Sequence, residues 1–233
     1  MKRAVLLSMW RNDAERGLAK RVTHLLDKSY GNLRYQWCVG DCDAMDTTEA
    51  MLRAIAKHHP ADITVIRYDT HIVGDDSNTR LRRLSEAFDV QLDNVRWDDE
   101  LVVLHESDLR TPVDIVERFI ASGKCPVAGW PTMTINGHEL MYDSFAYVHP
   151  DGRPYTNWEP RPEGVTQVKS FGSSWMCDAA DIRAGARSHG AGVLGVCADL
   201  RAMGRTLWID PTIEVVQPPE YWTAYQHAET AYR

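Results

Sequence analysis

The residues best suited to chemistry are two carboxylates that follow a short apolar segment near the middle of the chain. Residues 101–104 read Leu-Val-Val-Leu, and the sequence His-Glu-Ser-Asp follows at 105–108. Residues two apart in an extended chain point the same way, so Glu106 and Asp108 would present two carboxylates to one point. Such oxygen ligands suit Mn²⁺ or Mg²⁺, and a cation held there could neutralise a departing diphosphate. The simpler interpretation is a strand end with solvated acids.

Two further polar loops follow earlier apolar segments. After residues 4–9, Trp10 could stack on a nucleobase, and Arg11 could add charge and forked donors at a helix start that attracts phosphate. The simpler interpretation is that Trp10 packs in the core and Arg11 is solvated. After residues 35–39, the loop that begins at Asp41 could hydrogen-bond a base or ribose, or could serve only as a loop and helix cap.

Composition excludes several classes of protein. The chain has 233 residues with 26 basic and 33 acidic side chains, a formal charge of −7, and 44 % hydrophobic residues. This is ordinary globular usage, which excludes collagen and disordered polymers and argues against gripping nucleic acid by bulk charge alone. The five cysteines include no C-x-x-C pair, which indicates reduced thiols in a cytoplasmic protein. No apolar stretch reaches the roughly 18 residues of a membrane span, so no membrane insertion is expected.

The spacing of apolar residues predicts an α/β fold in one domain, 1–233. Apolar runs predict a mostly parallel central sheet with helices on both faces. The expected strands are 4–9, 35–39, 62–67, 101–104, 126–130, 168–176, 206–209 and 213–216. Helices are expected from Asp13, from a capping box at 46–49, over 81–92, from Thr111 as N-cap, over 179–188 and over 193–203. Residues 131–168, rich in Pro, Gly and aromatic residues, are expected to form a long loop, with 149–165 as a lid.

Several common motifs are missing. The sequence contains no G-x-G-x-x-G after the first expected strand, no Walker P-loop, no G-x-S-x-G and no H-E-x-x-H. These gaps argue against a dinucleotide-binding enzyme, a P-loop nucleotidase, an α/β-hydrolase and a zinc peptidase.

The order of the remaining motifs resembles that of GT-A fold glycosyltransferases, especially family-2-like enzymes that use nucleotide sugars. The resemblance covers roughly residues 3 to 218. Residues 4–12 resemble the opening strand and nucleotide loop, 37–48 resemble the base-binding segment, and Glu106-Ser107-Asp108 is similar to the D-x-D motif. Residues 199–204 and 208–211 resemble the helix-Gly-strand close of such domains. The segment 141–147 is similar to one in fungal Golgi mannosyltransferases of the same fold.

The resemblance implies a role for each residue. Trp10, Arg11, Asp41 and Ser107 would hold the nucleotide of the donor. Glu106 and Asp108 would bind the cation, with Gln217 standing where the family often has a metal-binding histidine. The family's Glu-Asp pair, which supplies the base, has no clear counterpart here. Asp199 and His189 are the nearest substitutes for that catalytic role.

The resemblance implies a metal-dependent, hexosyltransferase-like enzyme. It would move a sugar from a nucleotide-diphosphate donor, a UDP-sugar first of all, to an acceptor hydroxyl. Residues 1–130 would bind the donor and 131–233 the acceptor. The acceptor would be a glycan, a small molecule, or a DNA base bearing a hydroxymethyl group, as in phage DNA modification. Two alternatives stay open: a catalytically inactive nucleotide-sugar binding module, and a nucleotidyltransferase.

Overall fold

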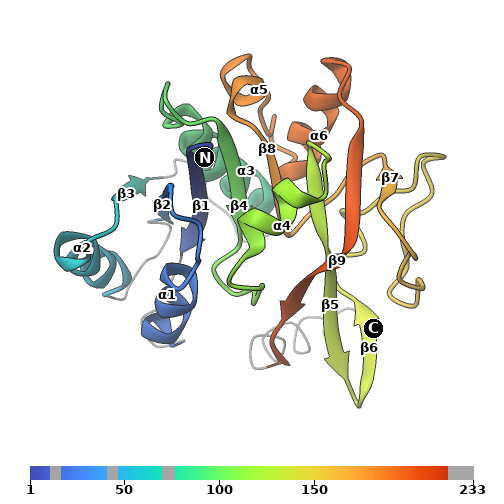
Figure 1. Cartoon of the computed structure of the whole chain (residues 1–233), viewed down its shortest axis with the longest axis horizontal. Helices are drawn as coiled ribbons and strands as arrows, with labels where there is room; N and C mark the ends of the chain where they lie inside the picture. Colours follow the sequence, from blue (N-terminus) through green and yellow to red (C-terminus); the bar gives the residue numbers. More distant parts are fainter. Residues whose placement is uncertain (11–16, 41–46, 70–76, 220–233) are drawn as a thin grey trace.

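The first half of the chain forms four parallel strands. The computed structural model describes residues 1–10, 17–40, 47–69 and 77–219. The four strands are β1 (Ala4–Trp10), β2 (Leu33–Gly40), β3 (Ile63–Tyr68) and β4 (Leu101–His105). Because β1 pairs in parallel with both β2 and β4, the carboxyl ends of these three strands share one edge of the sheet (Figure 1). This confirms the four strands expected from the apolar runs.

The second half adds five strands and makes the sheet mixed. These are β5 (Val127–Ile135), β6 (His138–Met141), β7 (Thr166–Val168), β8 (Ser174–Asp178) and β9 (Leu207–Gln217). The order along the sheet is β3-β2-β1-β4-β8-β5-β9-β7, and β6 pairs with β5. β8 runs antiparallel to both β4 and β5, while β5 and β9 are parallel to each other. The start of β8 and the end of β9 therefore lie at the same edge as the end of β4.

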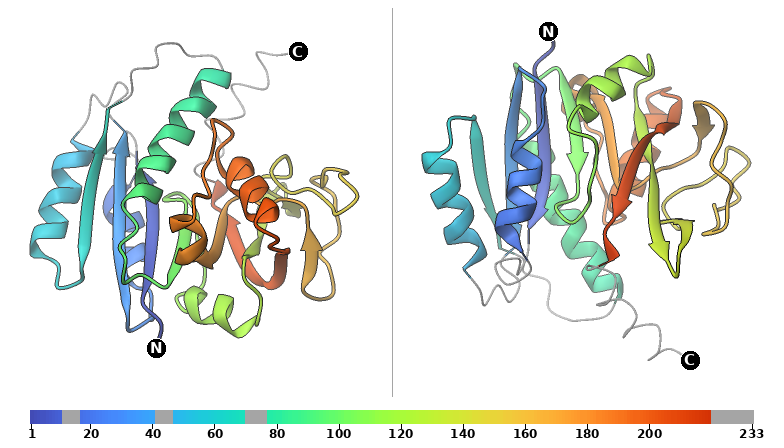
Figure 2. Two further views of the ribbon diagram at one scale, coloured as in Figure 1. Left: turned by 90° about the horizontal axis from the view of Figure 1, so that it is seen from above. Right: turned by 60° about the horizontal axis from the view of Figure 1, so that its bottom comes forward.

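Helices cover both faces of the sheet, because successive strand residues point to opposite sides. Leu6 packs in one cluster with apolar residues of the first two helices, and Leu7 packs in another with apolar residues of the third. The first, second and fourth helices thus cover one face, and the other three cover the opposite face (Figure 2). The six are α1 (Leu18–Leu26), α2 (Thr48–His58), α3 (Ser77–Asp93), α4 (Ile115–Ala121), α5 (Ala179–Arg183) and α6 (Val193–Ala202). The α/β fold class predicted from sequence is confirmed.

The region expected to be one long loop contains a β-hairpin. β5 continues past residue 131 to Ile135 and turns back into β6. The turn residues Asn136 and Gly137 have φ of 51° and 80°. Left-handed Asn-Gly turns match the twist of the strands they join, so Asn-Gly between extended residues is a hairpin signal that the loop interpretation missed.

Two other strand boundaries were wrong. The expected strand 168–176 is two strands in different parts of the sheet, since β7 pairs with β9 whereas β8 lies between β4 and β5. The expected strands 206–209 and 213–216 are one strand, β9, across Pro211. An irregularity in the β5–β9 pairing at Gly129 and Trp130 absorbs the extra residues. Sequence periodicity cannot reveal such a bulge, because it depends on the partner strand.

Helix starts also differ from expectation. α4 begins at Ile115 rather than just after Thr111, and the Thr111 hydroxyl is engaged by other side chains instead. α2 is preceded by Thr47, whose side chain makes no capping hydrogen bond. Asp46, the first residue of the expected capping box, lies outside the described residues. α1 begins at Leu18 after Gly17, and Asp13 lies outside the described residues.

Among the described helices, none combines the length and apolar character needed to cross a membrane. Four cysteines, Cys38, Cys125, Cys177 and Cys197, have free thiols. Burial raises the pKa of the Cys38 and Cys197 thiols to about 12, so both are inert, protonated core residues.

Candidate functional site

The two carboxylates singled out from the sequence lie in a turn at the carboxyl end of β4. The backbone N–H of Leu109 donates to the backbone oxygen of Glu106 at 3.2 Å, and this hydrogen bond closes the turn. Glu106 and Asp108 are half-buried, while Ser107 and Leu109 are buried. The chain is therefore turned here rather than extended, but exposure still alternates. Both carboxylates remain accessible at the edge of the sheet.

Arg21 of α1 fixes the middle of this turn. Its Nε donates to the Ser107 backbone oxygen at 2.8 Å, and a terminal guanidinium nitrogen donates to the Ser107 hydroxyl at 2.5 Å. Both residues are buried, at 8 % and 7 % exposure. The Ser107 side chain thus has a partner within the protein and acts to hold the turn in place.

A buried lysine fixes the far end of the same segment. Lys28 Nζ donates to the Thr111 backbone oxygen at 3.2 Å, to the Thr111 hydroxyl at 3.0 Å and to the Pro112 oxygen at 3.3 Å. Burial lowers the pKa of Lys28 to about 8. The ammonium group therefore binds oxygens that precede α4 and anchors the segment to the residues that follow α1.

Two histidines complete this network in their neutral form. His105 Nδ1 lies 2.8 Å from the Glu106 backbone oxygen and so carries the hydrogen, which leaves Nε2 to accept from the Thr111 hydroxyl at 2.7 Å. Burial, then the nearby Lys28 charge, lowers the pKa of His105 to about 3. His24 Nε2 accepts from the Thr111 N–H at 3.1 Å, and its pKa is lowered to about 4 by burial, Lys28 and Arg110.

The end of β9 lies beside the turn. Arg110 and Val216 exchange two backbone hydrogen bonds, of 2.8 and 2.7 Å. Gln217 follows directly, and it is 2 % exposed with a side-chain Oε1 that has no hydrogen-bond partner. An unpaired buried acceptor oxygen is costly unless something else satisfies it, and a cation would do so. Gln217 is thus suited in chemistry to the role that the sequence resemblance gave it.

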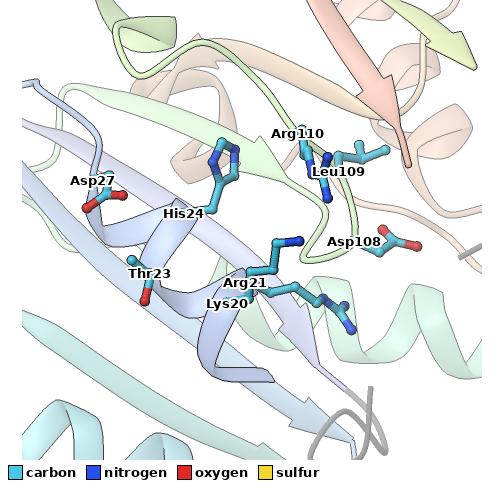
Figure 3. Close-up of a pocket in the computed structure, with 8 residues that line it drawn as sticks. All are labelled: Lys20, Arg21, Thr23, His24, Asp27, Asp108, Leu109 and Arg110. Atoms are coloured by element: carbon cyan, nitrogen blue, oxygen red, sulfur yellow. The ribbon is translucent and has the colours of Figure 1, made fainter. Parts of the chain in front are cut away.

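A pocket of about 440 Å³ opens between α1 and the turn. Figure 3 shows Lys20, Arg21 and His24 extending from α1 toward the segment that carries Asp108 and Arg110. The lining holds three permanent cations, Lys20, Arg21 and Arg110, and two acids, Asp27 and Asp108. This arrangement suits an anionic group placed next to a carboxylate that holds a cation.

The residues expected to bind the nucleotide are only partly described. Trp10 is 2 % exposed, with its ring 6.0 Å from that of Trp37 and the Arg21 guanidinium 5.4 Å from its centroid. This packing in the core is the simpler of the two interpretations drawn from the sequence. Arg11 and Asp41 lie outside the described residues. Each of them follows directly on a strand, β1 or β2, that ends at the edge carrying Glu106.

The two residues offered as substitutes for the family's base lie together. His189 Nε2 is 2.8 Å from Asp199 Oδ2, and the same oxygen accepts from the Arg187 N–H at 2.9 Å. The adjoining Ser188 bonds to Asp89 of α3. The pair therefore holds the α5–α6 connection against α3.

Sequence reasoning assigned no role to Asp143, although it lies in the segment that resembles mannosyltransferases. The Ser173 hydroxyl donates to Asp143 Oδ2 at 2.9 Å. Burial raises the pKa of Asp143 to about 7, hydrogen bonds from Ser173 oppose the rise, and the Asp108 charge adds to it. A third carboxylate is therefore within electrostatic reach of the turn. No local sequence signal could reveal it, because 35 residues and a change of strand direction separate it from Asp108.

Comparisons with known proteins establish the fold. No protein-family model and no curated protein matches the sequence. Among solved structures, GalNAc-T7 with UDP, GalNAc and Mn²⁺ has a TM-score of 0.63 at 11 % identity, covering 93 % of this chain and 43 % of that one. S. aureus TarS residues 1–349 with UDP-GlcNAc has a TM-score of 0.62 at 12 % identity, covering 94 % and 58 %.

A third similar structure is the mannosyltransferase PcManGT from Pyrobaculum calidifontis with GDP-Man and Mn²⁺. It has a TM-score of 0.58 at 14 % identity, covering 92 % of this chain and 56 % of that one. This chain thus spans less than two thirds of each of the three. Identity at this level shows a common fold. The protein therefore has the GT-A fold of nucleotide-diphospho-sugar transferases, as its motifs indicated.

Proposed function

We propose that this protein is a metal-dependent glycosyltransferase that moves a sugar from a nucleotide-diphosphate donor to an acceptor hydroxyl. The observation that carries the proposal is the accessible pair Glu106 and Asp108, held at the carboxyl edge of a GT-A sheet beside a pocket with three permanent cations. Ligands of open α/β sheets bind at this edge. A UDP-sugar is the first donor to test, since GalNAc-T7 was solved with UDP and TarS with UDP-GlcNAc.

The residues at the turn suit a divalent cation. Mn²⁺ or Mg²⁺ would be held by Glu106 and Asp108, with the unpaired Oε1 of Gln217 as a third oxygen. Mg²⁺ typically takes one or two protein carboxylates together with substrate phosphates, so a full protein shell is not required. When bound, the cation would supply positive charge to the diphosphate leaving group.

The chain's own residues would bind and orient the donor. Lys20 and Arg110 would add positive charge where the diphosphate lies. Arg21 and Lys28 would keep the turn rigid through their hydrogen bonds to Ser107 and Thr111. Arg11, Asp41 and Trp10 stay predictions as residues that bind the nucleotide. Asp199 and His189 stay the residues that the sequence resemblance implies for the base.

We also propose the division of the single domain into a donor half, 1–130, and an acceptor half, 131–233. A glycan, a small molecule or a hydroxymethylated DNA base stays open as acceptor, and a cytoplasmic location stays a prediction.

A donor panel tests the proposal. UDP-glucose, UDP-GlcNAc and GDP-mannose are each incubated with the protein and MnCl₂, and the released nucleotide is measured. Release of nucleoside diphosphate that stops on addition of EDTA supports a transferase. Pyrophosphate release from a sugar phosphate and a nucleoside triphosphate would instead indicate a nucleotidyltransferase. Mn²⁺-dependent binding of UDP without any turnover would indicate an inactive binding module.

A further inference from the structure

Two residues in an unusual backbone conformation meet beside the proposed cation site. Asp143 has φ of 60° and Ser173 has φ of 57°, and the Ser173 hydroxyl donates to the Asp143 carboxylate at 2.9 Å. Residues other than glycine rarely adopt this left-handed conformation, because it strains the backbone. Such strain persists only where the surroundings enforce it, and it gathers at functional sites.

The surroundings of Asp143 leave its carboxylate one position. A Cβ added at Gly172 would lie 2.1 Å from Asp143 Oδ2, so only glycine admits the carboxylate there. The Ala146 N–H donates to the Asp143 backbone oxygen at 3.0 Å and closes the turn that carries it. Beneath, the buried Tyr147 hydroxyl lies 3.1 and 3.0 Å from the backbone oxygens of Gly129 and Gly172.

The pairing of β4 with β8 brings this carboxylate to the β4 turn. Ser174 is paired with His105, and its hydroxyl donates to the Leu104 oxygen at 3.0 Å. Glu106 directly follows β4 and Ser173 directly precedes β8, so these two residues lie next to each other at the end of the antiparallel pair. Asp143, bound to Ser173, thus lies on the acceptor-half side of the turn that carries Glu106 and Asp108.

We propose that Asp143 is the catalytic base that accepts the proton of the acceptor hydroxyl. The inference rests on the proposed glycosyl transfer. As the acceptor oxygen bonds to C1 of the donor sugar, its proton passes to the Asp143 carboxylate. At the same time the bond from C1 to the β-phosphate oxygen breaks, and the nucleoside diphosphate leaves with the electron pair. A single displacement of this kind inverts the configuration at C1.

The Asp143 carboxylate is placed as a general base needs to be. Burial, and then the charge of Asp108, raises the pKa of Asp143 to about 7, so the carboxylate lies within electrostatic reach of the β4 turn. The Ser173 hydroxyl donates to its Oδ2 at 2.9 Å. Its orientation is fixed by Ser173, in the way that a hydrogen-bonded partner orients a general base.

The test compares Asp143→Asn with Asp62→Asn, the same chemical change at an exposed carboxylate just before β3, at the opposite edge of the sheet. Three quantities are measured on the full chain: thermal stability, Mn²⁺-dependent affinity for UDP and GDP, and turnover of the donor panel with water or methyl glycosides as acceptor. General bases contribute about 10²–10⁴-fold, so Asp143→Asn should lose at least about 100-fold in kcat. Its nucleotide affinity should stay within about twofold, because a base that binds the acceptor hydroxyl makes no contact with the nucleotide. Asp62→Asn should match the wild type in all three.

Ser173→Ala is a second test that remains informative if Asp143→Asn fails to fold. It keeps the Asp143 carboxylate and removes only the hydroxyl that orients it. It should lower kcat without changing nucleotide affinity, and the first sugar product of the wild type should have the inverted configuration. Full turnover in Asp143→Asn, retention at C1, or a loss of kcat in Asp199→Asn but not in Asp143→Asn would each overturn the assignment of the base. Failure of the wild type to bind nucleotide with Mn²⁺ would instead overturn the proposed function, and the base with it.

Discussion

Arg21 donates two hydrogen bonds to Ser107, one to the backbone oxygen at 2.8 Å and one to the hydroxyl at 2.5 Å. The two residues are 86 positions apart, and the contact fixes the residue between the two candidate cation ligands. Any geometry that Glu106 and Asp108 offer to a cation therefore depends on α1. The same guanidinium lies over Trp10, so the end of β1 is part of this support.

Replacing the guanidinium should disturb the turn. Arg21→Lys keeps the charge but loses the rigid fork that donates to both Ser107 oxygens. We expect a loss of about 1–3 kcal/mol in the free energy of unfolding, together with weaker Mn²⁺-dependent binding of UDP. Chemical denaturation and calorimetric titration measure the two effects. Arg53→Lys on α2, where Arg53 makes an exposed pair with Glu49, is the control and should change stability by less than about 0.5 kcal/mol. Unaltered metal-dependent binding in Arg21→Lys would contradict the supporting role.

Lys28 should matter for stability in a way that Lys20 does not. Lys28→Met removes the ammonium shared by Thr111 and Pro112 and leaves buried oxygens unpaired, which should cost about 1–3 kcal/mol. Lys20→Met, at an exposed position of α1, should change stability by less than about 0.5 kcal/mol and should weaken nucleotide binding instead. Denaturant unfolding of both variants checks this. Equal stability losses would show that the buried network does not anchor the segment.

The neutral histidines predict a stability that falls in mild acid. The pKa of His105 is about 3 in the folded protein and ordinarily 6.5, so below pH 6.5 the unfolded chain binds a proton that the folded chain does not. Stability from this group is complete above pH 6.5 and should decline by up to about 1.4 kcal/mol per pH unit toward pH 3. Unfolding measured at pH 7, 6 and 5 should show a shallower decline in His105→Gln, with His24 still contributing. Identical slopes would mean that His105 is protonated in the folded protein.

Gly172 should tolerate no side chain. In Gly172→Ala the new Cβ would lie 2.1 Å from Asp143 Oδ2 and 2.7 Å from Ala146 Cβ, so the Asp143 turn must move. Overpacking of this kind costs about 1–3 kcal/mol, and turnover should fall with it. Gly31→Ala, where only the Met1 sulfur lies within 4 Å of the added Cβ, at 3.8 Å, should leave both unchanged. A fully active Gly172→Ala protein would argue that the position of Asp143 is not critical.

The sheet was predictable where local pattern and final structure agree. β1 and β4 are short runs that are apolar on both faces, a pattern typical of strands in a sheet covered on both sides. Their parallel pairing then places Trp10 and Glu106 at one edge. The Glu106–Asp108 turn was found for the same reason: polar residues directly after such a strand must lie at that edge.

The rest depends on contacts between distant residues. Thr111 looked like a helix cap by its neighbours, but its hydroxyl is held by Lys28, 83 residues away. The Asp143 carboxylate lies against Gly172 and accepts a hydrogen bond from Ser173. The close approach at Gly172 and the left-handed backbone of Ser173 cannot be predicted from the neighbouring sequence. Trp10 was ambiguous for the same reason, because Trp37 and Arg21 decide its burial.

The central claim is that the β4 turn holds a cation that binds a nucleotide diphosphate. Calorimetric titration of UDP and GDP, in MnCl₂ and in EDTA, tests it most directly in the wild type, Asp108→Asn and the control Asp62→Asn. We expect nucleotide binding that requires Mn²⁺ in the wild type and control, and loss of that binding in Asp108→Asn with unchanged thermal stability. Nucleotide binding that is equally tight in EDTA, or an Asp108→Asn protein that binds as the wild type does, would contradict it.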